Sequence, residues 1–249
     1  MCQRCANDVA SNGQPASPSR RNALSMIGAI SLLGMSAAVQ AAQSKPPPKP
    51  HNALTPEEAI QRLMAGNERY VSGETRDKVF ASTRAALTRG QNPYACILSC
   101  ADSRVSPELC FDEERGDLFV TRVAGNYVTN DILASLEYGV AVLNTPLIMV
   151  LGHTRCGAIS AAVSSHEERA EFPGHIQTII TALLPAVRAA AGTSYTGTLT
   201  EASTVENIRQ NVKRLEKANP IISAAVLDKR TQVVGGIYDL ETGKVQLVT

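Results

Sequence analysis

Hydrophobic residues recur at two kinds of spacing from residue 54 onward, and each spacing predicts one type of element. Apolar residues three and four positions apart, such as Ile60, Leu63 and Met64, are typical of an amphipathic helix. Short uninterrupted apolar runs, such as residues 146–151, are typical of a buried strand. Helices are predicted over 55–72, 131–143, 156–165, 176–191 and 205–218, and strands over 94–100, 118–123, 146–151, 221–227, 233–238 and 244–248.

The alternation of these strands and helices predicts an α/β fold. We expect a mainly parallel central sheet flanked by helices, with an antiparallel edge formed by the hairpin around residues 239–243. In such sheets ligands gather beyond the carboxyl ends of the strands. Cys100 ends the first predicted strand, and His153 follows the third. The sequence therefore predicts a functional site at this edge of the sheet.

The N-terminal residues predict an export signal over 1–41 and a proline-rich tether over 42–53, ahead of one folded domain over 54–249. Arg20 and Arg21 precede a weakly apolar stretch, and residues 39–41 have the small or tolerated side chains that signal peptidases accept. This pattern is typical of a twin-arginine signal, which would place the protein in the periplasm without a stable membrane span. The alternative is an uncleaved membrane anchor, for which the run is short and rich in Gly and Ser.

Composition narrows the classes of partner. The formal net charge is +1 and Trp is absent, so neither a strong positive field nor an aromatic platform for nucleic acid is expected. Four cysteines in the folded domain are too few for a disulfide-stapled fold. Cys96 and Cys110 are either buried thiols or, after export, a disulfide pair. Cys2 and Cys5 lie within the predicted export signal.

Cys100, His153 and Cys156 form a candidate zinc site. Zinc binds thiolates and imidazoles, and its catalytic sites commonly combine three protein ligands with an open position. Cys156 is predicted near the start of a helix, where the helix dipole favours a thiolate. An isolated H-x-x-C pattern often arises by chance, and Cys100 alone could be an ordinary buried residue.

Asp102 and Arg104 make the zinc interpretation specific. An acid and a base two residues apart, immediately after a strand-ending cysteine, are hard to explain as core packing. On an exposed surface the same pair would contribute little to stability. The combination of C-x-D-x-R and H-x-x-C at two strand ends therefore predicts a catalytic zinc site rather than a structural one.

These motifs resemble those of the β-class carbonic anhydrases, and the resemblance extends from about residue 54 to residue 249. It implies one zinc ion per chain held by Cys100, His153 and Cys156, with Asp102 and Arg104 as a catalytic dyad. The implied reaction is the reversible hydration of carbon dioxide to bicarbonate and a proton by attack of a zinc-bound hydroxide. The implied assembly is a homodimer or a larger even oligomer. The matching stretches are 66–70, 100–107, 122–126, 135–138 and 152–158.

The same resemblance implies residues that contact substrate. Gln91 matches a substrate-binding glutamine of one branch, Phe119 and Tyr138 match aromatic positions of its carbon dioxide pocket, and Gly157 lies in a matching stretch next to Cys156. Ordinary core packing is the alternative for the two aromatic residues. Another branch has a tryptophan in a regulatory bicarbonate pocket where this chain has Ile97.

Two other functions are compatible with the same motifs. Some relatives hydrolyse carbonyl sulfide or carbon disulfide at this type of site. A noncatalytic zinc or bicarbonate-binding protein is the second alternative, although a structural zinc site needs a fourth fixed ligand. In this family Asp102 can also move onto the zinc and close the site. His166 and His175 are expected to be solvated or capping residues, with proton transfer as the alternative.

Overall fold

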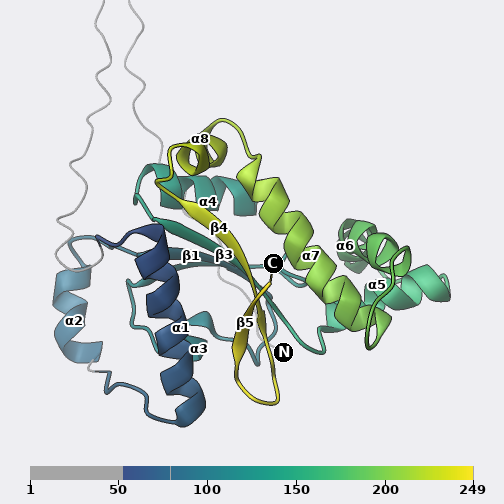
Figure 1. The fold of residues 1–249 in the computed structure, drawn as a ribbon, viewed down its shortest axis with the longest axis horizontal. Coiled ribbons are helices and arrows are strands. Elements are labelled where there is room, and N and C mark those ends of the chain that lie inside the picture. Colours follow the sequence, from purple (N-terminus) through teal and green to yellow (C-terminus); the bar gives the residue numbers. More distant parts are fainter. Residues whose placement is uncertain (1–52, 79, 249) are drawn as a thin grey trace, which may run out of the picture. The chain divides into compact units, whose positions relative to one another are not determined.

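The computed structural model describes residues 53–78 and 80–248, and five strands of this part form one sheet (Figure 1). The strand order is β2-β1-β3-β4-β5, in which the first four strands are parallel and β5 is antiparallel to β4. This confirms the predicted fold class. The export signal and all but the last residue of the tether lie outside the described residues. The strands are β1 (Ala95–Ser99), β2 (Leu118–Arg122), β3 (Leu147–His153), β4 (Gln232–Tyr238) and β5 (Val245–Val248).

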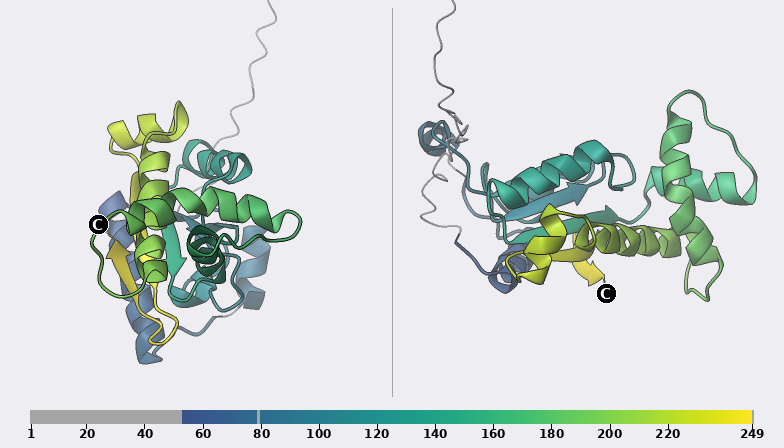
Figure 2. Two further views of the ribbon diagram at one scale, coloured as in Figure 1. Left: turned by 90° about the vertical axis from the view of Figure 1, so that its right-hand side faces the viewer. Right: turned by 90° about the horizontal axis from the view of Figure 1, so that it is seen from above.

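Helices cover both faces of the sheet and one of its ends. α1 and α3 share one apolar cluster with the sheet, and α4, α7 and α8 share another. α5 and α6 lie beyond the carboxyl ends of the strands, where they form a third cluster (Figure 2). Within the described residues, no helix is both long and apolar enough to span a membrane. The helices are α1 (Pro56–Ser72), α2 (Phe80–Leu87), α3 (Pro107–Cys110), α4 (Asn130–Ala141), α5 (Gly157–Glu167), α6 (Ile176–Ala191), α7 (Leu199–Glu216) and α8 (Ile221–Leu227).

A capping box begins helix α1. The backbone N–H of Glu58 donates to the Thr55 hydroxyl, and the Thr55 N–H donates to the Glu58 carboxylate at 2.8 Å. Further along α1, the buried Asn67 amide donates to the Gly243 carbonyl and accepts from the Val245 N–H at 2.8 Å. These bonds attach α1 to the β4–β5 hairpin.

The prediction of a strand over 221–227 is wrong, because this segment is helix α8. Ile222 and Ala225, three residues apart, are buried against the side of the sheet covered by α4 and α7, whereas Leu227 is 82% exposed. A seven-residue apolar run fits both a strand and a buried helical turn, so spacing alone does not decide between them. The fourth strand of the sheet is β4, which was predicted separately.

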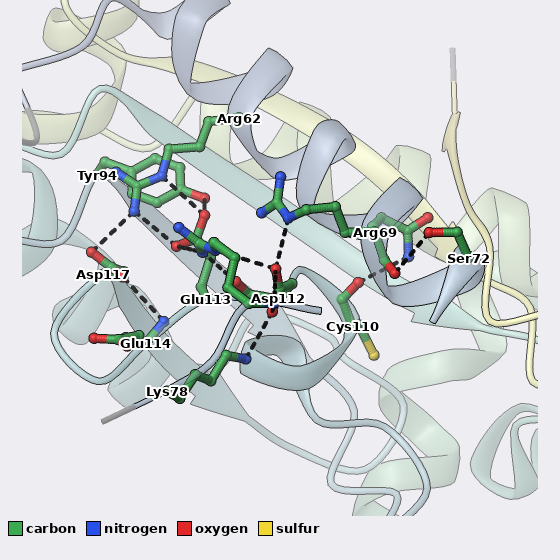
Figure 3. A network of polar contacts seen from close by, with 12 residues as sticks. Arg62, Arg69, Ser72, Lys78, Tyr94, Cys110, Asp112, Glu113, Glu114 and Asp117 are labelled. Atoms are coloured by element: carbon green, nitrogen blue, oxygen red, sulfur yellow. Dashed lines mark hydrogen bonds and ion pairs between the residues drawn. The ribbon is translucent and has the colours of Figure 1, made fainter. Parts of the chain in front are cut away.

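Two buried carboxylates connect α1 to the loop after α3 (Figure 3). The Asp112 carboxylate lies 2.7 Å from Arg69 Nε and 3.2 Å from Lys78 Nζ. The Glu113 carboxylate accepts two hydrogen bonds from Arg62, at 2.9 and 2.8 Å. Neither carboxylate side chain is exposed. Because a buried charge is costly without partners, this cationic shell is what permits the two acids to remain ionised.

We expect the Asp112→Asn variant to be less stable than wild type at pH 7 by about 2 kcal/mol. Burial raises the pKa of Asp112, but Arg69 and the neighbouring cations outweigh it and lower the pKa to about 2, from an ordinary value of 3.8. A lowered folded-state pKa stabilises the fold above the ordinary value and loses this effect as the pH falls. The difference in the free energy of unfolding between variant and wild type should therefore shrink as the pH falls from about 4 to 2.

Urea unfolding at several pH values measures this difference. Asp228→Asn is the matched control, because Asp228 forms an ion pair with Arg230 in which both side chains are more than half exposed. Exposed pairs contribute little to stability, so the control should unfold like wild type. If Asp112→Asn lowers the free energy of unfolding by the same amount from pH 7 to pH 2, the loss of stability does not come from the ionised Asp112 carboxylate.

Candidate metal centre

Three side chains with soft donor atoms meet at the carboxyl ends of β1 and β3. Cys100 directly follows β1, His153 is the last residue of β3, and Cys156 is the N-cap of α5. Because β1 and β3 are adjacent and parallel, with Ser99 paired to Leu151, both strands end at the same edge. The donor atoms of the three residues lie within 4.8 Å of one another, and all three residues are buried.

The geometry of this cluster fits a zinc ion. The sulfur atoms of Cys100 and Cys156 are 4.0 Å apart, and two thiolates on a tetrahedral zinc, each bound at about 2.3 Å, would be about 3.8 Å apart. His153 Nδ1 lies 2.9 Å from the Thr154 carbonyl oxygen, so this nitrogen carries the ring proton. The buried Nε2 atom has no hydrogen-bond partner among the described residues. A metal ion would satisfy that lone pair.

The surroundings of the two cysteines favour a thiolate on Cys100. Its hydrogen bond with Cys156 lowers the pKa of Cys100, and backbone N–H groups of Gly125 and Asp102 act in the same direction against burial. The same hydrogen bond, burial and the charge on Cys100 raise the pKa of Cys156. Burial lowers the pKa of His153, but Cys100, the Thr154 backbone and Asp102 together raise it by more. A divalent cation between the sulfur atoms would remove the repulsion that opposes the second thiolate.

Arg104 holds the Asp102 carboxylate beside the metal cluster. Arg104 Nε donates to Asp102 Oδ1 at 2.9 Å, and Nη2 donates to Oδ2 at 2.7 Å and to the Arg155 carbonyl at 3.3 Å. Asp102 Oδ2 is 3.8 Å from His153 Nε2. The hydrogen bonds from Arg104 hold the pKa of Asp102 well below its usual range despite partial burial. The carboxylate is thus ionised and engaged by arginine, which leaves a fourth coordination position available.

Arg122 supports the same loop, and sequence analysis assigned it no role of its own. Its Nε donates to the Cys100 carbonyl at 2.8 Å, and its Nη2 donates to the Asp102 carbonyl at 2.6 Å. The only signal in the sequence is a base at the end of a predicted strand. Its function depends on the pairing of Ser99 with Arg122 between β1 and β2, which the sequence does not reveal.

Three residues predicted to contact substrate lie away from the cluster within one chain. Gln91 precedes β1 and lines an open surface pocket, whereas Cys100 follows that strand. Phe119 pairs with Cys96, four residues before Cys100, which corresponds to roughly 13 Å along a strand. Tyr138 on α4 is 47% exposed, and its ring centroid lies 6.2 Å from that of Phe119. Their substrate role remains a prediction.

The remaining predicted residues are readily placed. Gly157 follows Cys156 as the first residue of α5, and a Cβ atom there would meet nothing within 4 Å. Cys96 and Cys110 are free, buried thiols in apolar clusters on opposite faces of the sheet, so the disulfide alternative does not hold. His166 and His175 are exposed, at the end of α5 and just before α6.

The fold and this site define an α/β protein with a metal-binding centre that combines three ligands with an adjacent carboxylate. Comparison with known proteins identifies the family. The family model described as "Carbonic anhydrase" matches residues 95–245. The chain is 35% identical to carbonic anhydrase 2 of Mycobacterium tuberculosis, over 77% of this chain and 92% of the relative. It is 34% identical to a carbonic anhydrase of Mycolicibacterium smegmatis, over 77% and 93%.

Solved structures agree with this result. The β-carbonic anhydrase CcaA aligns with a TM-score of 0.59 and 29% identity, over 76% of this chain and 94% of CcaA. A Coccomyxa β-carbonic anhydrase aligns with a TM-score of 0.59 and 26% identity, over 77% and 82%. The chain therefore belongs to the β-class carbonic anhydrase family and is an enzyme.

We expect the purified protein to hold one zinc ion per chain, and the Cys156→Ser variant to lose it. A serine hydroxyl does not ionise near neutral pH and is a poor replacement for a thiolate. The matched control is Cys96→Ser, because Cys96 is a buried thiol that contacts Thr145 Oγ1 and not the cluster. Atomic emission after dialysis gives the zinc content. Equal zinc content in Cys156→Ser and Cys96→Ser would contradict the assignment of Cys156 as a zinc ligand.

Proposed function

We propose that this enzyme catalyses the zinc-dependent, reversible hydration of carbon dioxide to bicarbonate and a proton. The observation that carries the proposal is the position of Asp102, whose Oδ2 lies 3.8 Å from His153 Nε2 while Arg104 binds both carboxylate oxygens. A purely structural zinc site would use a fourth fixed ligand. Here the three residues that would hold zinc lie beside an ionised carboxylate, which is suited to orient a reacting water.

Cys100, His153 and Cys156 would hold zinc, which would lower the pKa of a bound water toward about 7 and so supply a hydroxide nucleophile. Asp102 would accept the hydrogen bond of that nucleophile and thereby direct a lone pair toward carbon dioxide. Arg104 keeps Asp102 ionised, because its hydrogen bonds lower the pKa of the carboxyl group. Asp102 itself therefore does not titrate near neutral pH.

The positions of Gln91, Phe119 and Tyr138 support a homodimer or larger even oligomer. If these residues contact carbon dioxide, they must come from a second copy, since in one chain they lie away from Cys100. Tyr138 on α4 and Val142, the C-cap of the same helix, are both exposed. They provide an apolar surface for such a contact. A β-carbonic anhydrase of Sordaria macrospora with the same fold is tetrameric.

We expect the Asp102→Asn variant to keep its zinc and to lose about 100-fold or more in kcat/KM for carbon dioxide hydration. An amide cannot replace the carboxylate as a strong acceptor, and it loses the ion pair with Arg104. Stopped-flow assays between about pH 6.5 and 9 measure this loss. Glu241→Gln is the matched control. Glu241 forms an exposed ion pair with Arg155, whose backbone carbonyl accepts a hydrogen bond from Arg104.

Two results would separate the parts of this proposal. An inactive wild-type enzyme with full zinc across that pH range would rule out carbon dioxide hydration. Full activity of Asp102→Asn would rule out the role of the dyad while leaving the zinc assignment intact. Glu241→Gln should retain activity close to that of wild type, because exposed ion pairs have small energetic effects.

We also propose export to the periplasm by the twin-arginine route, with removal of residues 1–41. This route carries folded proteins, so the thiolate ligands could bind zinc in a reducing cytoplasm before export. Joint replacement of Arg20 and Arg21 by lysine should keep the protein in the cytoplasm, whereas Arg4→Lys should not. Cell fractionation and N-terminal sequencing test this. An intact N-terminus in the membrane fraction would indicate an anchor instead.

A further inference from the structure

The loop between β2 and α4, residues 123–129, brings a backbone N–H group to a metal ligand. The Gly125 nitrogen lies 3.3 Å from the Cys100 sulfur. Gly125 has a φ of 84°, and a Cβ atom at this position would lie 2.8 Å from the Leu183 side chain. Both the left-handed backbone and the close approach favour glycine. The direction of this N–H therefore depends on how the loop is held.

Helix α7 holds this loop through polar side chains, of which the two amides, Asn207 and Asn211, are buried. Asn207 Nδ2 donates to the Gly125 carbonyl at 2.9 Å. One turn later, Asn211 Oδ1 accepts from the Val128 N–H at 2.7 Å, and Arg214 Nη1 donates to the Val128 carbonyl at 2.8 Å. Asn211 also donates to Asn207 Oδ1 at 3.0 Å, which orients the Asn207 amide. The loop is thus bound to α7 at both Gly125 and Val128.

Asn207 is 3% exposed, and its neighbours on α7 include the apolar Ile208. An amide at such a position costs free energy unless it is hydrogen-bonded. Its Nδ2 atom is directed at the Gly125 carbonyl, just before the turn at Asn126, and the nitrogen of the same Gly125 meets Cys100. The Gly125 carbonyl and N–H lie in adjacent peptide units that are joined through one Cα atom. Because only the φ and ψ angles of Gly125 separate these two planar units, fixing the carbonyl restricts where the N–H can point.

We propose that Asn207 is a positioning residue for the metal centre: it holds the Gly125 carbonyl so that the Gly125 N–H hydrogen-bonds the Cys100 sulfur. The inference rests on the proposed zinc function. Two thiolates would donate more negative charge to zinc than two imidazoles. This donation would make the zinc ion a weaker Lewis acid. An N–H···S hydrogen bond withdraws some of that charge. At the other thiol, the backbone N–H groups of Ala158 and Ile159 at the start of α5 favour the thiolate of Cys156, although Cys100 and burial raise its pKa.

Replacement of zinc by cobalt in the full protein makes this bond visible, since thiolate-to-cobalt charge transfer absorbs in the near ultraviolet. The Asn207→Asp variant keeps the size of the side chain but removes the donor to the Gly125 carbonyl. We expect its charge-transfer band to move to longer wavelength, because a sulfur without the N–H bond gives up an electron more easily. Its zinc affinity, measured against a chelator, should change by about 10-fold.

Asn67→Asp is the matched control. Asn67 is as buried as Asn207, at 2% exposed, and it also bonds backbone groups, at Cys110, Gly243 and Val245. This variant should lose stability without moving the cobalt band. Asn207→Ser, which is uncharged and too short to reach Gly125, should move the band in the same direction as Asn207→Asp and provides the test if the aspartate variant does not fold.

An unshifted band in the Asn207 variants, with stability reduced as in Asn67→Asp, would show that Asn207 is only structural and would overturn the proposal. A wild-type cobalt protein with no thiolate band would refute the zinc function itself, and this inference with it. The wild-type spectrum thus separates the two failures.

Discussion

The placement of two cysteine sulfur atoms 4.0 Å apart is the constraint on which the rest of the site depends. Two thiolates at that distance repel each other in a buried environment, so both can ionise only when a cation lies between them. A buried imidazole nitrogen without a partner completes the set of donors. The cluster is therefore suited to hold a metal ion between two thiolates and an imidazole.

The sheet supplies this constraint through its topology. β1 and β3 are neighbouring parallel strands, so Cys100 and His153 lie at the same edge of the sheet without any long loop. α5 begins directly after Cys156, and the dipole of its first N–H groups favours a thiolate at that position. Helix α6 and the start of α7 then cover the cluster with apolar side chains. A low-dielectric environment strengthens each electrostatic interaction within the site.

Around the ligands, three kinds of interaction control charge. Arg104 keeps Asp102 ionised and away from the fourth position, while Arg122 fixes the backbone carbonyls of Cys100 and Asp102. The Gly125 N–H bonds the Cys100 sulfur, which reduces the negative charge on that atom. In the function proposed above, these features would reconcile a thiolate-rich zinc site with the Lewis acidity that hydration of carbon dioxide requires. The buried acids Asp112 and Glu113 belong to a separate, structural network.

The α/β class, most elements and the five residues predicted to form the zinc site could be inferred from the amino-acid sequence alone. These inferences use short-range spacing, because the apolar strand runs, C-x-D-x-R and H-x-x-C each span only a few residues. Three features became evident only in the folded chain: residues 221–227 form a helix, Arg122 reaches the Cys100 loop, and Asn207 hydrogen-bonds Gly125 from 82 positions away. Such contacts arise from strand register and helix packing, which local periodicity does not encode. Gln91, Phe119 and Tyr138 match the family's substrate-binding positions in sequence, yet they lie away from the metal site within one chain. Sequence spacing does not encode these distances either.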